Sequence, residues 1–139
     1  MWEPQKNTTK LYILVLLIFL AIDMLWLGVI MSKFYKAELG VLARRTGENL
    51  APIWWAAFVV YLLIPLGIIL FVLPRAIQGG SPFIWGFVYG VILYGVYDFT
   101  NYSLVDNWPW RMTVVDILWG GWICALTSRV AFFLDRWLT

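Results

Sequence analysis

Histidine is absent from the sequence, and cysteine occurs once, as Cys124. Without histidine, the chain cannot ligate haem or chlorophyll through an imidazole, build a histidine zinc site, or form a Ser-His or Cys-His dyad. A single cysteine also excludes a disulfide within the chain, and its place in an apolar run indicates a small packing residue. We therefore expect no cofactor and no metal, and any group that titrates inside the protein must be Asp, Tyr or Cys.

Charge is also scarce, because Asp, Glu, Lys and Arg make up 13% of the 139 residues and hydrophobic residues make up 63%. A soluble domain of this length has too much surface to be so apolar, so a lipid bilayer must supply part of the solvent. We expect membrane lipid as a partner and no nucleic acid.

Four apolar runs account for most of the chain. They extend over roughly residues 11–31, 53–73, 83–105 and 112–133. Each run is long enough to cross a hydrocarbon core of about 30 Å as a helix. None shows the period-2 alternation of a membrane β-strand. The sequence therefore predicts an all-α integral membrane protein, with residues 1–139 forming a single domain of four transmembrane helices.

The connections between the runs bear on topology. Those at residues 75–82 and 106–111 are short, which favours antiparallel neighbours and predicts an up-down bundle. The first connection, residues 32–45, mixes bases with apolar residues, and it fits a short interfacial helix and a solvated connector equally well. Lys and Arg number five on each side of the expected bundle, so the positive-inside rule leaves the orientation open.

Three carboxylates lie inside the apolar runs, at Asp23, Asp98 and Asp116. A charge at bilayer depth costs at least about 2.5 kcal/mol, so such residues normally face a protein interior and mark function. In an up-down bundle, all three fall in the same half of the membrane, and we predict one shared cluster. Because Lys, Arg and His are missing at that depth, we expect the cluster to hold at least one proton at neutral pH.

Two of these acids belong to a repeated pattern, D-x-L-W-x-G, at residues 23–28 and 116–121. Trp26 and Trp119 each come three residues after an acid and share nearly the same helical face with it. An indole N–H at this position can be donated to a carboxylate. We therefore predict that both tryptophans cover or bond the acids.

The third run carries glycines and polar residues on one helical face. Gly86, Gly90, Tyr94 and Asp98 follow one another at i+4, and Asn101 comes at i+3. The first two residues form a G-x-x-x-G pair, which permits close approach of a neighbouring helix. We expect the same close approach at Gly120 in the fourth run and at Gly28 in the first.

Proline interrupts the second run at Pro65. Because proline has no amide proton, the carbonyl of Tyr61 loses its helical donor. A kink at this point either turns a free carbonyl toward the interior or serves packing against a neighbouring helix. We favour packing.

Five segments resemble domain-of-unknown-function family 2177, in order and over nearly the whole chain. They are residues 23–28, 34–40, 97–101, 108–109 and 116–120. The resemblance implies a small four-span protein of the bacterial inner (plasma) membrane. It also implies that Tyr97, Thr100 and Asn101 are motif positions, together with the three acids and the two tryptophans. The family carries no activity, so no catalytic residue is assigned.

We predict that the acids, with Trp26, Tyr94, Tyr97, Thr100, Asn101 and Trp119, form a site that binds or transports a proton, a cation or a polar lipid headgroup. Because four spans are few for a carrier, we expect a homodimer in that case. A first alternative is an accessory or structural subunit of a larger membrane complex. A second is an intramembrane acid–base enzyme acting on a lipid. The enzyme is the less favoured, since the sequence specifies no nucleophile and no leaving group.

Overall fold

The structure is a computed structural model, and it describes residues 7–47 and 49–138. Within these residues, four helical segments are long and apolar enough to cross a membrane: Thr8–Ile30, Trp54–Ile77, Pro82–Leu104 and Trp110–Leu138. Helices satisfy every backbone polar group internally, which the hydrocarbon core requires. The predicted all-α fold with four membrane helices is confirmed.

The first membrane segment consists of α1 (Thr8–Leu25) and the π-helix η1 (Trp26–Ile30). It is followed by α2 (Ser32–Leu39), the 3-10 turn η2 (Gly40–Leu42) and two short antiparallel strands, β1 (Arg45–Thr46) and β2 (Asn49–Leu50). The second comprises α3 (Trp54–Gly67), the π-helix η3 (Ile68–Val72) and α4 (Leu73–Ile77). The third and fourth are the single helices α5 (Pro82–Leu104) and α6 (Trp110–Leu138).

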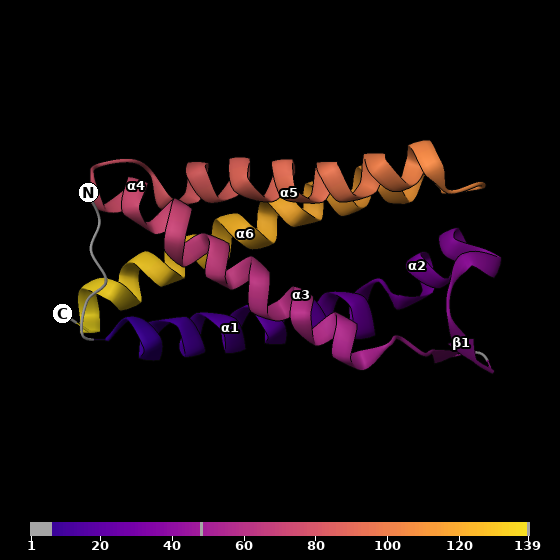
Figure 1. The fold of residues 1–139 in the computed structure, drawn as a ribbon, viewed down its shortest axis with the longest axis horizontal. Helices are drawn as coiled ribbons and strands as arrows, with labels where there is room; N and C mark the ends of the chain where they lie inside the picture. The colour runs from indigo at the N-terminus through magenta and orange to yellow at the C-terminus, as the bar shows by residue number, and fades with distance from the viewer. Residues whose placement is uncertain (1–6, 48, 139) are drawn as a thin grey trace.

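The long helices differ in how they pack. In Figure 1, α1 and α5 run away from the end that holds the two termini, whereas α3 and α6 run back toward it. Helices α5 and α6 lie side by side, and α6 also packs against α1. Helix α3 crosses obliquely: α3 itself packs against α1, whereas η3 and α4 contact α5 and α6. The crossing therefore leaves the first part of α3 apart from α5.

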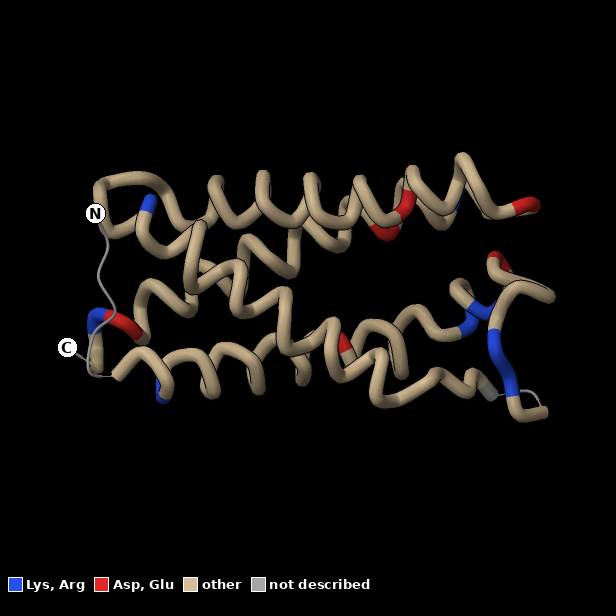
Figure 2. The backbone as a smooth tube through the Cα atoms, in the orientation of Figure 1, with Lys and Arg blue, Asp and Glu red and all other residues tan. Residues whose placement is uncertain are grey.

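The buried core joins α1, the second membrane segment and α6. Val15, Phe19, Ile68 and Ile123 are fully buried there. Many apolar side chains on the outer faces are exposed instead, which is the pattern expected of helices surrounded by lipid. Figure 2 shows Lys and Arg concentrated at the two ends of the molecule, while acidic residues also occur along the helices between them.

Glycines set the closest helix contact, between α5 and α6. A Cβ atom on Gly90 would collide with the carbonyl of Gly120, and one on Gly120 would collide with the ring of Tyr94. A Cβ on Gly86 would lie 2.6 Å from a backbone oxygen of α6. Gly28, by contrast, would place a Cβ in open space. The expectation of close packing at Gly28 is wrong, because η1 turns this residue to the exposed side of the chain.

Pro65 lies buried inside α3, and the helix widens into η3 three residues later. Tyrosines from neighbouring helices donate hydrogen bonds to backbone carbonyls between Tyr61 and Pro65. Tyr12 bonds the carbonyl of Leu62 at 2.6 Å, and Tyr89 bonds that of Ile64 at 3.0 Å. Neighbouring side chains commonly supply such donors near a proline in a membrane helix.

Candidate functional site

Asp23 of α1 is buried at a junction of helices. Its Oδ2 accepts a hydrogen bond of 2.6 Å from the hydroxyl of Tyr61 on α3, and its Oδ1 accepts one of 3.0 Å from the indole Nε1 of Trp119 on α6. Hydrogen bonds to an ionised carboxylate are stronger than those between neutral groups. The two donors therefore offset part of the cost of burying this acid.

Asp116 of α6 is half-buried and belongs to a second set of hydrogen bonds. Its Oδ1 accepts a bond of 3.0 Å from the hydroxyl of Tyr35 on α2, and this hydroxyl accepts one of 3.2 Å from the indole Nε1 of Trp26. Burial and the nearby Asp116 carboxylate raise the pKa of Tyr35 above its ordinary value. The hydroxyl therefore stays protonated and acts as a donor to Asp116.

Trp26 and Trp119, the tryptophans of the two motif copies, connect the hydrogen bonds at Asp23 with those at Asp116. The rings of Trp26 and Trp119 stack with 4.1 Å between centroids and 3° between planes. Trp119 bonds the acid of the first motif copy, while Trp26 reaches the acid of the second copy through Tyr35. The two copies of D-x-L-W-x-G thus form one interlocked unit at the contact of α1 with α6.

A cavity of about 440 Å³ lies against this unit, within the range of small-molecule sites. Its walls come from α1, η1, α3, α5 and α6. Its polar side chains are those of Asp23, Asp116, Tyr61, Tyr94 and Tyr97, and the rest of the lining is aliphatic. Among the described residues, no Lys or Arg lines it. The cavity therefore combines two acids with apolar walls, and the described part of the chain supplies no basic counter-charge there.

The cavity lies where α3 and α5 separate. Val60 and Leu63 on α3, and Leu93 and Tyr97 on α5, line it and are also exposed at the protein surface. These residues lie inside membrane-spanning helices, away from the helix ends. The opening therefore lies at the depth of the membrane-spanning helices and not at a loop.

Asp98 of α5 lies beside this site and does not line the cavity. It is 0% exposed, and neither carboxyl oxygen has a hydrogen-bond partner among residues 7–47 and 49–138. It lies close enough to Asp116 to interact electrostatically, and Asp116 also interacts with Asp23. Asp116 is thus the common neighbour of the other two acids. In the described part of the chain, no group of three His, Cys, Asp or Glu residues is placed to hold a metal ion.

The remaining predicted site residues lie at the edge of this region. Tyr97 makes an edge-to-face contact with Trp108, with 6.2 Å between ring centroids. Thr100 is exposed and Asn101 is half-buried, and neither lines the cavity. The site thus includes Tyr94 and Tyr97 in its walls, with Thr100 and Asn101 beyond them toward the end of α5.

Two tyrosines of the site were missed by the sequence analysis. Tyr35 lies in the connection after the first membrane segment, and Tyr61 was considered only for its backbone carbonyl. Tyr35 falls inside residues 34–40, one of the five segments that resemble the family. This resemblance was the sequence feature that could have indicated Tyr35 as a site residue. Periodicity within one helix cannot reveal either contact, because each hydroxyl meets an acid on another element.

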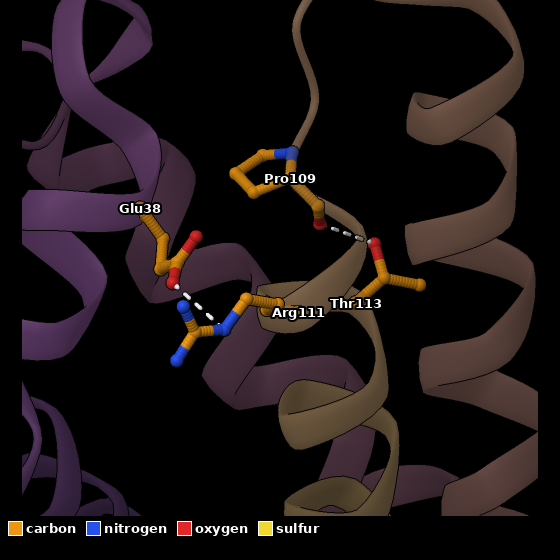
Figure 3. A network of polar contacts seen from close by, with 4 residues as sticks. All are labelled: Glu38, Pro109, Arg111 and Thr113. Atoms are coloured by element: carbon orange, nitrogen blue, oxygen red, sulfur yellow. Dashed lines mark hydrogen bonds and ion pairs between the residues drawn. The ribbon is translucent and has the colours of Figure 1, made fainter.

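Helix α2 is tied to the start of α6 by an ion pair. Glu38 Oε1 lies 3.6 Å from Arg111 Nε, as Figure 3 shows. In the same first turn of α6, the hydroxyl of Thr113 donates a hydrogen bond of 2.9 Å to the carbonyl of Pro109. Tyr35 lies one helical turn before Glu38 on α2. The ion pair of Glu38 with Arg111 therefore helps to keep the Tyr35 hydroxyl within hydrogen-bonding distance of Asp116.

Residues 8–133 match the family model described as "Predicted membrane protein (DUF2177)". Comparisons with curated proteins and with solved structures found no match. The matched region contains every residue of the cavity, both tryptophans and Asp98. The resemblance carried by the five sequence segments is therefore confirmed, and the chain belongs to the DUF2177 family of predicted membrane proteins.

Proposed function

We propose that the protein binds an amphipathic ligand in the cavity between α3 and α5. The ligand's positively charged head lies at Asp23 and Asp116, and its apolar part lies along the aliphatic walls. One observation carries the proposal: carboxylates from two different helices line a cavity whose other walls are aliphatic and aromatic, and no Lys or Arg of the described residues lines it. Intramembrane acids that face a cavity typically mark the path or the site of an ion or substrate.

The hydrogen bonds that Asp23 and Asp116 already accept indicate what kind of head group the site can bind. Asp23 uses both oxygens to accept bonds from Tyr61 and Trp119. Asp116 accepts a bond from Tyr35 at one oxygen, and a carboxylate has about four lone-pair sites. Asp116 therefore has acceptor capacity to spare for an ammonium group, while Asp23 contributes charge nearby. A low local dielectric strengthens both attractions.

The apolar part of the ligand is defined by the opening. Leu63 and Leu93 are exposed on either side of it, at a depth where lipid surrounds the protein. A molecule that partitions into the bilayer enters such a cavity sideways, without passing through a loop. A long-chain amine or a lipid with a cationic head meets both requirements, whereas a small hydrated cation gains nothing from the aliphatic walls.

The setting of this function is also a proposal. The resemblance to four-span bacterial proteins supports the bacterial inner membrane as its location. The broad apolar outer faces support contact with lipid. A homodimer or a larger membrane complex stays a prediction.

The test uses the full chain in phosphatidylcholine nanodiscs, with dodecylamine as the charged probe and dodecanol as its neutral counterpart. Binding is measured as the rise in melting temperature with probe concentration, followed by tryptophan fluorescence. We expect dodecylamine to stabilise the protein more than dodecanol does. Asp116→Asn should weaken the apparent affinity about tenfold or more, since a hydrogen bond to a charged group contributes about 1.5–3 kcal/mol. Asp23→Asn should also weaken it, because this change removes a negative charge close to the head of the ligand.

The matched control is Asp106→Asn, the same chemical change at an exposed acid in the connection between α5 and α6. This variant should bind the amine as the unchanged protein does. Equal stabilisation by the amine and the alcohol would refute the proposal. So would an affinity that neither cavity substitution alters.

A further inference from the structure

Asp98 is a buried acid that does not line the cavity. Its side chain is completely buried between α5 and α6, and both oxygens lack a hydrogen-bond donor in the described part of the chain. An ionised carboxylate without donors or water is very unfavourable in such a place, whereas a neutral carboxylic acid needs only an acceptor for its proton. The surroundings of Asp98 therefore select the protonated form.

The acceptor is supplied by the facing helix. Asp116 interacts electrostatically with Asp98, and Tyr97, on the same helix as Asp98, is a second titratable group near it. On the other elements, Asp116 interacts with Asp23 on α1 and bonds Tyr35 on α2. Two carboxyl groups at close range cannot both be ionised, and they commonly share a proton.

The helix contact keeps this pair closed. The backbones of α5 and α6 come so close that a Cβ on Gly90 would collide with the carbonyl of Gly120, and a Cβ on Gly120 would collide with the ring of Tyr94. Asp98 lies two helical turns after Gly90 on the same face of α5. Asp98 itself has no exposed surface, so Asp116 is the partner within reach.

We infer that Asp98 and Asp116 share one proton, with Asp98 as the positioning residue that donates to Asp116 and Asp116 as the anion that meets the ligand. The second half of this inference rests on the proposed function. Only the proton is shared, and no covalent bond is made. The site then presents two negative charges, on Asp23 and Asp116, in place of three.

The first test needs no ligand. Infrared spectra of the protein in nanodiscs at neutral pH should contain the C=O stretch of a protonated carboxylic acid, and this band should shift in D₂O. Asp98→Asn should remove the band, and Asp23→Asn, as the matched change at an acid with two donors, should leave it. A spectrum without the band, or a band that survives in Asp98→Asn, would overturn the shared proton.

The second test separates positioning from simple packing, again with dodecylamine as the probe. An asparagine at position 98 can still donate an N–H to Asp116, so Asp98→Asn should keep the affinity within about threefold. Asp98→Leu has a similar size and no donor, and it should weaken binding about tenfold or more. Equal affinities in the two variants would overturn the positioning role. If Asp98→Asn does not fold, the D₂O shift of the band in the unchanged protein and its persistence in Asp23→Asn decide the first half of the inference.

If the band is present but the amine does not bind, the proposed function is refuted and the shared proton is supported. If the amine binds but the band is absent, the shared proton is refuted and the proposed function is supported. The two proposals therefore fail separately.

Discussion

Asp23 and Asp98 are both buried acids of membrane helices, yet their surroundings are opposite. Asp23 lies where α1, α3 and α6 meet, accepts two hydrogen bonds and borders a cavity. Asp98 is fully buried on α5, interacts with Asp116 of α6 and accepts none within the described residues. The comparison teaches that two buried acids can differ in their donors: donors favour the charged form of a carboxyl group, and a lack of donors favours the neutral form.

The largest loss of stability is expected when the contact between α5 and α6 is disturbed. Gly90→Ala places a methyl group against the carbonyl of Gly120, so α5 and α6 must separate. We expect a loss of about 3 kcal/mol or more in the free energy of unfolding, at the upper end of overpacking effects. Unfolding in mixed detergent micelles, followed by circular dichroism, measures this loss.

Gly95 on the same helix is the control, because a Cβ there meets nothing within 4 Å. Gly95→Ala should leave stability unchanged or raise it by up to about 1 kcal/mol through helix propensity. If the two substitutions cost the same, close packing of α5 on α6 is not what holds Asp98 in place.

A smaller loss is expected when Asp23 loses one of its two hydrogen-bond donors. Tyr61→Phe removes one of the two hydrogen bonds to Asp23 and should cost about 1.5–3 kcal/mol, the range for a bond to a charged group. Tyr89→Phe removes a bond of the same donor type to the neutral carbonyl of Ile64 and should cost about 0.5–1.5 kcal/mol. The same unfolding assay compares the two. A larger cost for Tyr89→Phe would argue that Asp23 is not ionised.

The smallest effect is expected at the surface contact that holds α2. Arg111 is 66% exposed on its side chain, and an exposed ion pair contributes at most about 1 kcal/mol. Glu38→Gln should therefore lower stability by less than that, and the difference should shrink at high salt. Arg44→Gln, at an exposed base in the same connection, is the control for the general effect of charge. A salt-independent loss well above 1 kcal/mol would mean that Glu38 does more than pair with Arg111.

Much of the membrane fold could be predicted because its signals are local. The apolar runs encode four helices, since the bilayer leaves a chain of this composition few other ways to satisfy its backbone. The i+4 spacing of Gly86 and Gly90 indicated a close helix contact, and the structure places α6 there. Gly28 carried the same kind of signal and led to a wrong expectation, because its surroundings depend on how η1 turns.

The site was predictable in part. Inserted acids and the repeated tryptophan pattern indicated where polar contacts would gather, because each is costly or unusual inside an apolar helix. The donors on Asp23 and Asp116 were not predictable, since Tyr35 and Tyr61 come from separate elements and look ordinary within their own.

The sequence by itself determined that the chain is helical, resides in a membrane and carries three acids at similar depth, because composition and length act on each segment independently. Only the tertiary structure decided that the acids differ. The oblique crossing of α3 leaves a cavity beside Asp23 and Asp116, whereas Asp98 is fully buried on α5 without a donor among the described residues. Helix packing therefore sets which acid borders open space and which acid is enclosed, because packing controls where donors and space are found.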